Sequence, residues 1–262
     1  MPTKKVAKRK TSTSSRKIVS SRKINSRISN KVKIAIISSV IALGGSGGGI
    51  AIYNATTTPT EPNNPPTMVV EGGYKISQER YNRVVAELGK LAVRADNYNP
   101  ELSFSDVKML SWLDLDGNKC HARQDILIRD LTSITTDGCD VLTGILLDPY
   151  TAQEISYTKG SNTIDIDHVV AKKDAWNSGG WQWDYAGWKD FVNDPEELLA
   201  VSASANRSKG DKNAAEWLPT NESFRCLYVA IQVDVKTKYT LSVTNSEKNA
   251  ISTILSNNCQ IE

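Results

Sequence analysis

An uncharged run of twenty residues, 34–53, separates two parts of this chain with opposite charge. Residues 1–33 carry twelve Lys and Arg side chains, and the first acidic residue of the chain is Glu61. About twenty apolar residues are needed for an α-helix to cross a membrane, and basic residues mark its cytoplasmic side. The sequence therefore predicts a basic cytoplasmic tail, a transmembrane anchor and an exported remainder.

A cleaved signal peptide is the alternative interpretation of residues 34–53. Five glycines between Gly44 and Gly49 weaken the run as a spanning helix, and residues 34–43 have the length of a signal peptide's apolar region. Either way, we expect the domain beyond it to be at the cell surface or secreted. Residues 54–73 are rich in Thr, Pro and Asn and are predicted to be an extended linker.

The exported part is acidic, although the whole chain has a net charge of +3. Twenty Lys and Arg remain beyond residue 33 against 29 Asp and Glu, which leaves a net charge of about −9. The basic tail therefore says nothing about nucleic-acid binding by the exported domain. Contact with a polyanion needs a local basic cluster or a bound metal ion.

All four cysteines, Cys120, Cys139, Cys226 and Cys259, lie in the exported part. An even number of cysteines in an exported domain is typical of disulfides, here with three possible connectivities. Proximity in the sequence favours Cys120–Cys139 and Cys226–Cys259. Zinc binding is the alternative, but the chain has no Cys-x-x-Cys pair.

Helical and extended patterns alternate in the exported part. Residues 74–96 are predicted to contain an amphipathic helix, covering 76–95 with Ser77 as N-cap, which packs onto the domain or extends the linker. Further helices are expected at 122–131, 172–177, 223–238 and 246–256. Extended runs are expected at 141–147, 155–158 and 163–170, the first two forming a hairpin across 148–151. The domain is therefore predicted to be α+β.

Two local patterns each allow two interpretations. The acidic segment 112–118 resembles a calcium loop, but its glycine comes too early for an EF-hand, so a structural turn is favoured over a calcium site. Four tryptophans at 176, 181, 183 and 188 are more typical of core packing than of stacking on bases.

The strongest candidate site combines Asp167 and His168 with Asn206. Asp and Asn provide hard oxygen ligands for a Mg²⁺-like ion, and a neutral imidazole can take a proton from water. Strand residues alternate in direction, so Asp165 and Asp167 share a face, and a bend is needed before His168 joins them. We expect Asp165 to orient a neighbouring group or to support the shell of the metal ion.

Basic residues follow Asn206 on a predicted helix start. Arg207 and Lys209 are expected to meet phosphate charge, with Asp211 holding one of them in place and Gly210 allowing the chain to turn. Together these residue types suit the hydrolysis of a phosphodiester bond.

Several separate blocks, in the same order, resemble the exported bacterial branch of the HNH endonucleases, also called the ββα-metal or His-Me finger family. The resemblance runs from about residue 97 to 259 and rests on Asp165-Ile166-Asp167-His168-Val169-Val170, Ala205-Asn206-Arg207-Ser208-Lys209-Gly210-Asp211 and Glu216-Trp217-Leu218-Pro219, with the 112–118 segment and the four cysteines. It implies a disulfide-stapled α+β domain over 97–262, with a ββα-metal core, extra helices and a β-hairpin.

The resemblance also implies roles for the site residues. Asp167 and Asn206 correspond to the metal ligands, for Mg²⁺ or Mn²⁺, and His168 to the general base. Glu197 stands where the family has an Asn that braces the loop bearing the base.

We therefore expect a metal-dependent endonuclease of low sequence specificity that acts on DNA, with RNA as a further possible substrate. The alternative, supported by Glu197 and the acidic charge, is a non-catalytic surface domain that keeps the nuclease fold. The sequence does not determine the oligomeric state.

Overall fold

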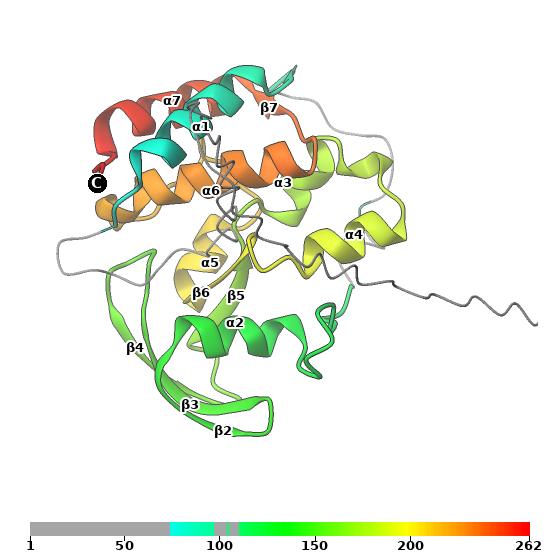
Figure 1. Ribbon diagram of the computed structural model, residues 1–262, viewed down its shortest axis with the longest axis vertical. Coiled ribbons are helices and arrows are strands. Elements are labelled where there is room, and N and C mark those ends of the chain that lie inside the picture. Colours follow the sequence, from blue (N-terminus) through cyan, green and yellow to red (C-terminus); the bar gives the residue numbers. More distant parts are fainter. Residues whose placement is uncertain (1–73, 97–103, 105–109) are drawn as a thin grey trace, which may run out of the picture. The chain divides into compact units, whose positions relative to one another are not determined.

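A computed structural model describes residues 74–96, Phe104 and residues 110–262 of the chain (Figure 1). The predicted basic tail, apolar anchor and linker, residues 1–73, lie outside the described residues. The described part mixes helices with short strands, as the α+β prediction requires. None of its helices is both long enough and apolar enough to cross a bilayer.

Three helices pack together on one side of the domain: α1 (Gln78–Lys90), α6 (Arg225–Lys238) and α7 (Asn245–Asn258) (Figure 1). Ser77 caps α1 as predicted, because its hydroxyl accepts a hydrogen bond from the Arg80 backbone N–H (3.2 Å). Val84 and Leu88 of α1 are buried in the same hydrophobic cluster as most of α6. The α1 helix therefore packs onto the domain.

The α1 helix is shorter than the predicted helix over residues 76–95. Ile76 forms a β-bridge with Ile261, and β1 (Val93–Arg94) pairs in parallel with β7 (Val243–Thr244). Both ends of the predicted helix therefore have β-partners from the C-terminal part of the chain. Such distant partners override a local helical pattern.

The hairpin predicted across residues 148–151 is confirmed. Strands β2 (Thr132–Asp137), β3 (Asp140–Leu147) and β4 (Glu154–Thr158) form an antiparallel sheet in the order β2-β3-β4. The α2 helix (Ala122–Asp130) packs against β3. Strand β2, which is short, rich in Thr and little buried, was not predicted from the sequence.

A second ladder lies at the centre of the domain, where β5 (Ile164–His168) pairs antiparallel with β6 (Leu198–Ser202). Helix α3 (Lys172–Asn177), the 3-10 turn η2 (Gly180–Gln182) and α4 (Tyr185–Val192) connect the two strands. Helix α5 (Ala203–Lys209) follows β6 directly and ends at Gly210, whose φ of 53° lies in the left-handed region. Strands β5 and β6 and helix α5 thus form a β-β-α succession.

The β5–β6 ladder separates two hydrophobic cores. Ile164, Ile166, Leu198 and Ala200 face a core shared with α2 and β3, whereas Leu199 and Val201 belong to the larger core built around α6. Side chains of neighbouring positions on these strands therefore enter different environments.

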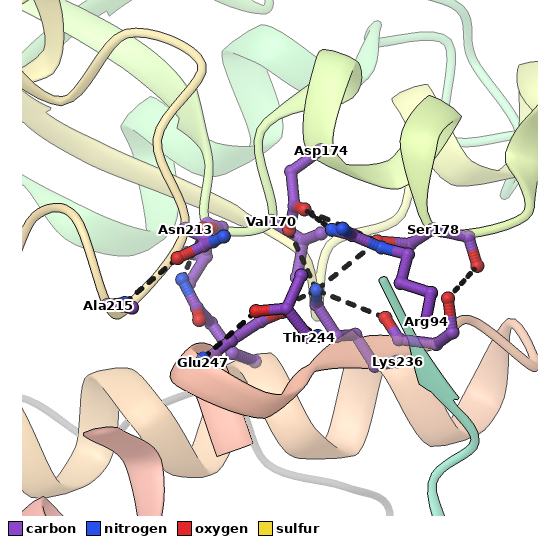
Figure 2. A network of polar contacts seen from close by, with 12 residues as sticks. Arg94, Val170, Asp174, Ser178, Asn213, Ala215, Lys236, Thr244 and Glu247 are labelled. Carbon is purple, nitrogen blue, oxygen red and sulfur yellow. Dashed lines mark hydrogen bonds and ion pairs between the residues drawn. The ribbon is translucent and has the colours of Figure 1, made fainter. Parts of the chain in front are cut away.

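Buried charges connect the helices around α3, as Figure 2 shows. The Lys236 ammonium of α6 lies between the carboxylates of Asp174 (2.7 Å) and Glu247 (2.6 Å), and Arg94 pairs with the same Asp174 (2.8 Å). Because every charge in this buried network has an opposite partner, it joins β1, α3, α6 and α7 without leaving an unpaired ion.

Both disulfides form with the pairing that sequence proximity favoured. Cys120–Cys139 joins the segment before α2 to the β2–β3 turn, and Cys226–Cys259 joins α6 to the end of α7. The acidic segment 112–118 is held by its own turns, since the Asp114 carboxylate accepts from the backbone N–H groups of Gly117 (2.7 Å) and Lys119 (2.9 Å).

The tryptophans of the 176–188 segment pack inside the protein. Trp176 and Trp188 are buried, with ring centroids 5.9 Å apart, and Trp181 and Trp183 pack against the same core. Core packing is therefore their role in this structure, as their number and spacing favoured.

Candidate active site

The register of β5 sets the directions of the candidate side chains. Asp165 pairs with Val201 and Asp167 with Leu199, so both carboxylates leave β5 on the face of the larger core. His168 pairs with Leu198, and Val169 N–H donates to the Glu197 carbonyl (3.0 Å). The predicted bend before His168 is therefore wrong: pairing continues through it, and its side chain leaves on the opposite face from Asp167.

Asp167 is buried and bound on both oxygens. Its Oδ1 accepts from the Lys209 ammonium (2.9 Å), and its Oδ2 accepts from the Tyr150 hydroxyl (2.5 Å). Burial raises the pKa of the Asp167 carboxyl, while the Lys209 charge opposes that rise. Two donors thus stabilise a carboxylate that burial alone would disfavour.

Lys209 does not reach toward the surface as the phosphate-binding prediction required. Its side chain is fully buried, and its ammonium donates to Asp167 Oδ1 and to the His168 carbonyl (2.7 Å). The expected partner Asp211 is exposed. The prediction for Lys209 is corrected: it links the two halves of the site, because α5 turns this side chain back onto the end of β5.

Asp165 and Asn206 meet across 41 positions of sequence. The Asn206 amide nitrogen donates to Asp165 Oδ2 (3.2 Å), which joins α5 to β5. This contact agrees with the expectation that Asp165 orients a neighbour. An amide held through its nitrogen presents its oxygen as an acceptor, the form in which Asn serves a hard cation.

Two aromatic rings and one backbone carbonyl contact the His168 imidazole. Trp112 stacks on one side at a centroid distance of 5.7 Å, and Phe191 stacks at 6.0 Å. Nε2 lies 3.0 Å from the Val192 carbonyl oxygen. Burial, and to a smaller extent the charge of Lys172, lowers the pKa of His168 to about 3. The ring is therefore neutral at ordinary pH.

Glu197 binds the segment that follows His168. Both of its carboxylate oxygens accept from the Val170 backbone N–H (3.0 and 3.2 Å), and its side chain is fully buried. Burial raises the pKa of this carboxyl well above its usual value. A carboxylate thus makes the contact to this loop for which an Asn was expected.

Arg207, in the last turn of α5, and Asp211, beyond its C-terminal end, are both exposed. Among the residues that the structure describes, no three His, Cys, Asp or Glu side chains cluster as a metal site. A cation held by Asp167 and Asn206 would therefore have two protein ligands, with the remaining positions left to water and substrate, as is usual for Mg²⁺.

Sequence reasoning missed Tyr150, Trp112 and the Val192 carbonyl. Tyr150 stands in Asp148-Pro149-Tyr150-Thr151, which was interpreted only as a hairpin turn, and Trp112 only as part of an acidic loop. Both residues reach the site through tertiary contacts. Aromatic residues inside turn sequences were the available signal, because turns seldom need them.

Comparison with known proteins identifies a related family and a related protein. Residues 121–254 match the family model described as GmrSD restriction endonucleases, C-terminal domain. A protein of Arthroderma benhamiae, described as an uncharacterized secreted protein, is 35% identical over 175 residues, which is 66% of this chain and 82% of that protein. No solved structure matches the chain.

Proposed function

Because the chain belongs to the GmrSD restriction endonuclease C-terminal domain family, we propose that it is a nuclease whose active site lies at the end of β5. We further propose that it is a metal-dependent endonuclease of the HNH type, cutting DNA with low sequence specificity, and that β5, β6 and α5 are its ββα-metal core. A bacterial origin, which the family resemblance implied, stays a prediction.

The observation that carries this proposal is the contact between Asp165 and Asn206. It brings the amide of α5 to the strand that bears Asp167 and His168. The proposed catalytic set therefore comes from one strand end and the helix packed beside it, with the His168 side chain on the opposite face of β5 from Asp167. Each also has the chemistry that its role requires: a carboxylate, a neutral imidazole and an oriented amide.

Asp167 and Asn206 would hold the ion, Mg²⁺ or Mn²⁺, through hard oxygen atoms. When bound, such an ion stabilises negative charge on the phosphate and on the leaving oxygen. In the described structure the Lys209 ammonium lies against Asp167 at 2.9 Å. That charge favours the ionised form of the carboxyl, the form that binds a cation, against the effect of burial.

His168 is the proposed general base. It removes one proton from a water molecule as the water oxygen bonds to phosphorus, and the bond from phosphorus to the leaving 3′-oxygen breaks. That oxygen takes a proton from solvent, so the products are a phosphomonoester and a hydroxyl group. A neutral imidazole is required, and the lowered pKa of His168 provides it.

In this proposal a single basic side chain near the site attracts the substrate, and the net charge of the domain does not. The exported part has a net charge of about −9, so its overall field repels a polyanion. Exposed Arg207, beside Asn206, is the residue we propose to contact phosphate. The secreted description of the related protein supports an exported location, which we propose for this chain, whether released or anchored through residues 34–53.

Glu197 no longer favours the non-catalytic alternative. Its two contacts with Val170 N–H supply the brace whose loss was the argument against activity. We therefore retain one proposed function and treat loss of catalysis as an outcome of its test.

The test is plasmid cleavage by the full chain with Mg²⁺ or Mn²⁺, compared with His168→Ala and Arg207→Ala. We expect His168→Ala to lower the rate about 100-fold or more, since general bases contribute about 10² to 10⁴. Arg207→Ala should chiefly raise KM. Titrating Mn²⁺ into wild type and Asp167→Ala separately tests ion binding. Equal cutting by wild type and His168→Ala would contradict the proposal, as would equal Mn²⁺ affinity in wild type and Asp167→Ala.

A further inference from the structure

His168 is held by residues that the proposed chemistry does not use. Trp112 comes from the acidic segment before α2, and Phe191 and Val192 come from the end of α4. The two segments are about 80 positions apart in the chain, so their meeting at one imidazole depends on tertiary contacts.

Asn193 connects these two segments. Its side-chain oxygen accepts from the Leu113 backbone N–H (2.7 Å), next to Trp112, and its amide nitrogen donates to the Lys189 carbonyl of α4 (2.9 Å). Asn193 itself is buried, at 3% exposure. A single amide thus fixes the Trp112 backbone to the helix end that presents the Val192 carbonyl.

The other end of the Trp112 segment is also fixed. Ala122 N–H donates to the Leu113 carbonyl (2.9 Å), and Asp114 closes the turn through Gly117 and Lys119. The Cys120–Cys139 disulfide then attaches the segment to the β2–β3 turn. The acidic motif, which the proposed function leaves unexplained, therefore shapes the loop that carries Trp112.

The edge contact decides where the imidazole proton resides. A carbonyl oxygen only accepts hydrogen bonds, so the 3.0 Å contact with Val192 requires the proton on Nε2. Nδ1 of the neutral ring is then the acceptor. Rotation of the ring, or loss of the carbonyl, would allow the other tautomer and remove the base from its position.

We propose that Trp112, Phe191, Val192 and Asn193 form a histidine clamp that holds His168 as the Nε2–H tautomer with Nδ1 as the accepting nitrogen. Trp112 and Asn193 are its positioning residues: Trp112 prevents rotation of the ring, and Asn193 holds Trp112 against the end of α4. The catalytic meaning of the clamp rests on the proposed function, but the tautomer does not.

The first measurement is therefore the tautomer itself, in the full chain with ¹⁵N-labelled histidine and no added metal. The chain has two histidines, so the spectrum of His168→Gln identifies the signals of His121. For wild type we expect one protonated nitrogen, Nε2, and one unprotonated nitrogen, Nδ1, in long-range ¹H–¹⁵N spectra. In Trp112→Ala and Asn193→Ala we expect averaged shifts from a mixture of tautomers.

Conservative variants separate positioning from general damage. Trp112→Phe keeps a stacking ring and should retain the wild-type spectrum. Asn193→Asp keeps the acceptor for Leu113 N–H but loses the donor to the Lys189 carbonyl, so its spectrum should lie between those of wild type and Asn193→Ala. Trp181→Ala, a partly buried tryptophan outside the clamp, is the matched control. Thermal unfolding of every variant identifies any change that merely prevents folding.

Kinetics provide the second measurement. Misplacing a general base lowers kcat, so Trp112→Ala should lose about 10-fold to 100-fold in kcat with KM within about twofold of wild type, and Trp112→Phe should recover most of it. Unchanged tautomers in folded Trp112→Ala and Asn193→Ala would overturn the clamp. A raised KM with unchanged kcat would overturn it too, because Trp112 would then contact substrate. Failure of the proposed function would be distinguishable from failure of the clamp, because wild type would then show the expected tautomer but cut no nucleic acid.

Discussion

Glu197 has no exposed surface, and its carboxylate lies against the Val170 backbone N–H beside the proposed base. From the sequence this residue was a departure from a family pattern, and a reason to doubt activity. In the structure its carboxyl oxygens accept from the Val170 N–H, and an amide oxygen at that position can accept the same hydrogen bond. The negative charge of an ionised Glu197 costs free energy, because the side chain is buried, whereas an uncharged acceptor at this position avoids that cost.

This cost predicts a pH dependence of stability. The pKa of Glu197 is raised above 4.5 in the folded protein, so its contribution is fully present below pH 4.5 and is lost as pH rises through the folded pKa. Glu197→Gln keeps an acceptor without the charge. Its free energy of unfolding should therefore rise relative to wild type as pH increases from about 4.5. Urea unfolding across this range checks it, with exposed Glu154→Gln as control. Parallel curves for wild type and Glu197→Gln would be the contrary result.

At the scale of elements, the position of α1 shows what helical periodicity can and cannot establish. The pattern located the helix, its N-cap and its apolar face, and Val84 and Leu88 are indeed buried. Val85, an apolar residue next to Val84 on the same helix, is nevertheless 44% exposed. A stripe of apolar residues is broader than the contact surface, because the neighbouring helices α6 and α7 decide which part is covered.

Shortening a side chain on the buried side of α1 should lower the free energy of unfolding more than shortening one on the exposed side. Leu88→Ala removes buried apolar volume and should lower the free energy of unfolding by about 2–5 kcal/mol. Val85→Ala, on the same helix, should change it by less than about 0.5 kcal/mol. Chemical denaturation of the full chain gives both values. Similar small effects would mean that α1 does not belong to the cooperative core.

At the scale of the whole molecule, two disulfides lie at opposite ends of the described domain's sequence. Cys120 and Cys139 are 19 positions apart, and Cys226 and Cys259 are 33 positions apart. The first fixes the loop of the histidine clamp, and the second fixes α6 to α7. Their distribution agrees with an exported protein, in which covalent links persist.

Removing the second disulfide should destabilise the whole molecule. Cys226→Ala combined with Cys259→Ala should lower the free energy of unfolding by about 2–5 kcal/mol, since the unfolded chain gains freedom. Cleavage of plasmid should be retained at a temperature where the variant is folded, because this disulfide joins α6 to the end of α7 and not to β5, β6 or α5. Wild type unfolded under reducing conditions loses both disulfides and should be no more stable than the double variant. An unchanged midpoint would show that the covalent link contributes nothing.

The sequence by itself determined which residues could carry the chemistry: Asp167 and His168 together, Asn206 downstream, and cysteines placed for two local disulfides. These are statements about residue type, order and spacing, which local physical chemistry links to function. Most helices and the 148–151 hairpin were predictable for the same reason, because their hydrogen bonds are made between near neighbours, although α4 was not predicted.

Only the tertiary structure decided what surrounds these residues. Lys209 is turned inward onto Asp167, and His168 meets Trp112 and Val192. Each of these contacts joins positions at least 24 apart. Burial and side-chain direction at such distances depend on how whole elements pack, and no local pattern encodes them. The sequence therefore named the chemical groups of this site, and the packing of the fold determined their partners, their protonation and their roles.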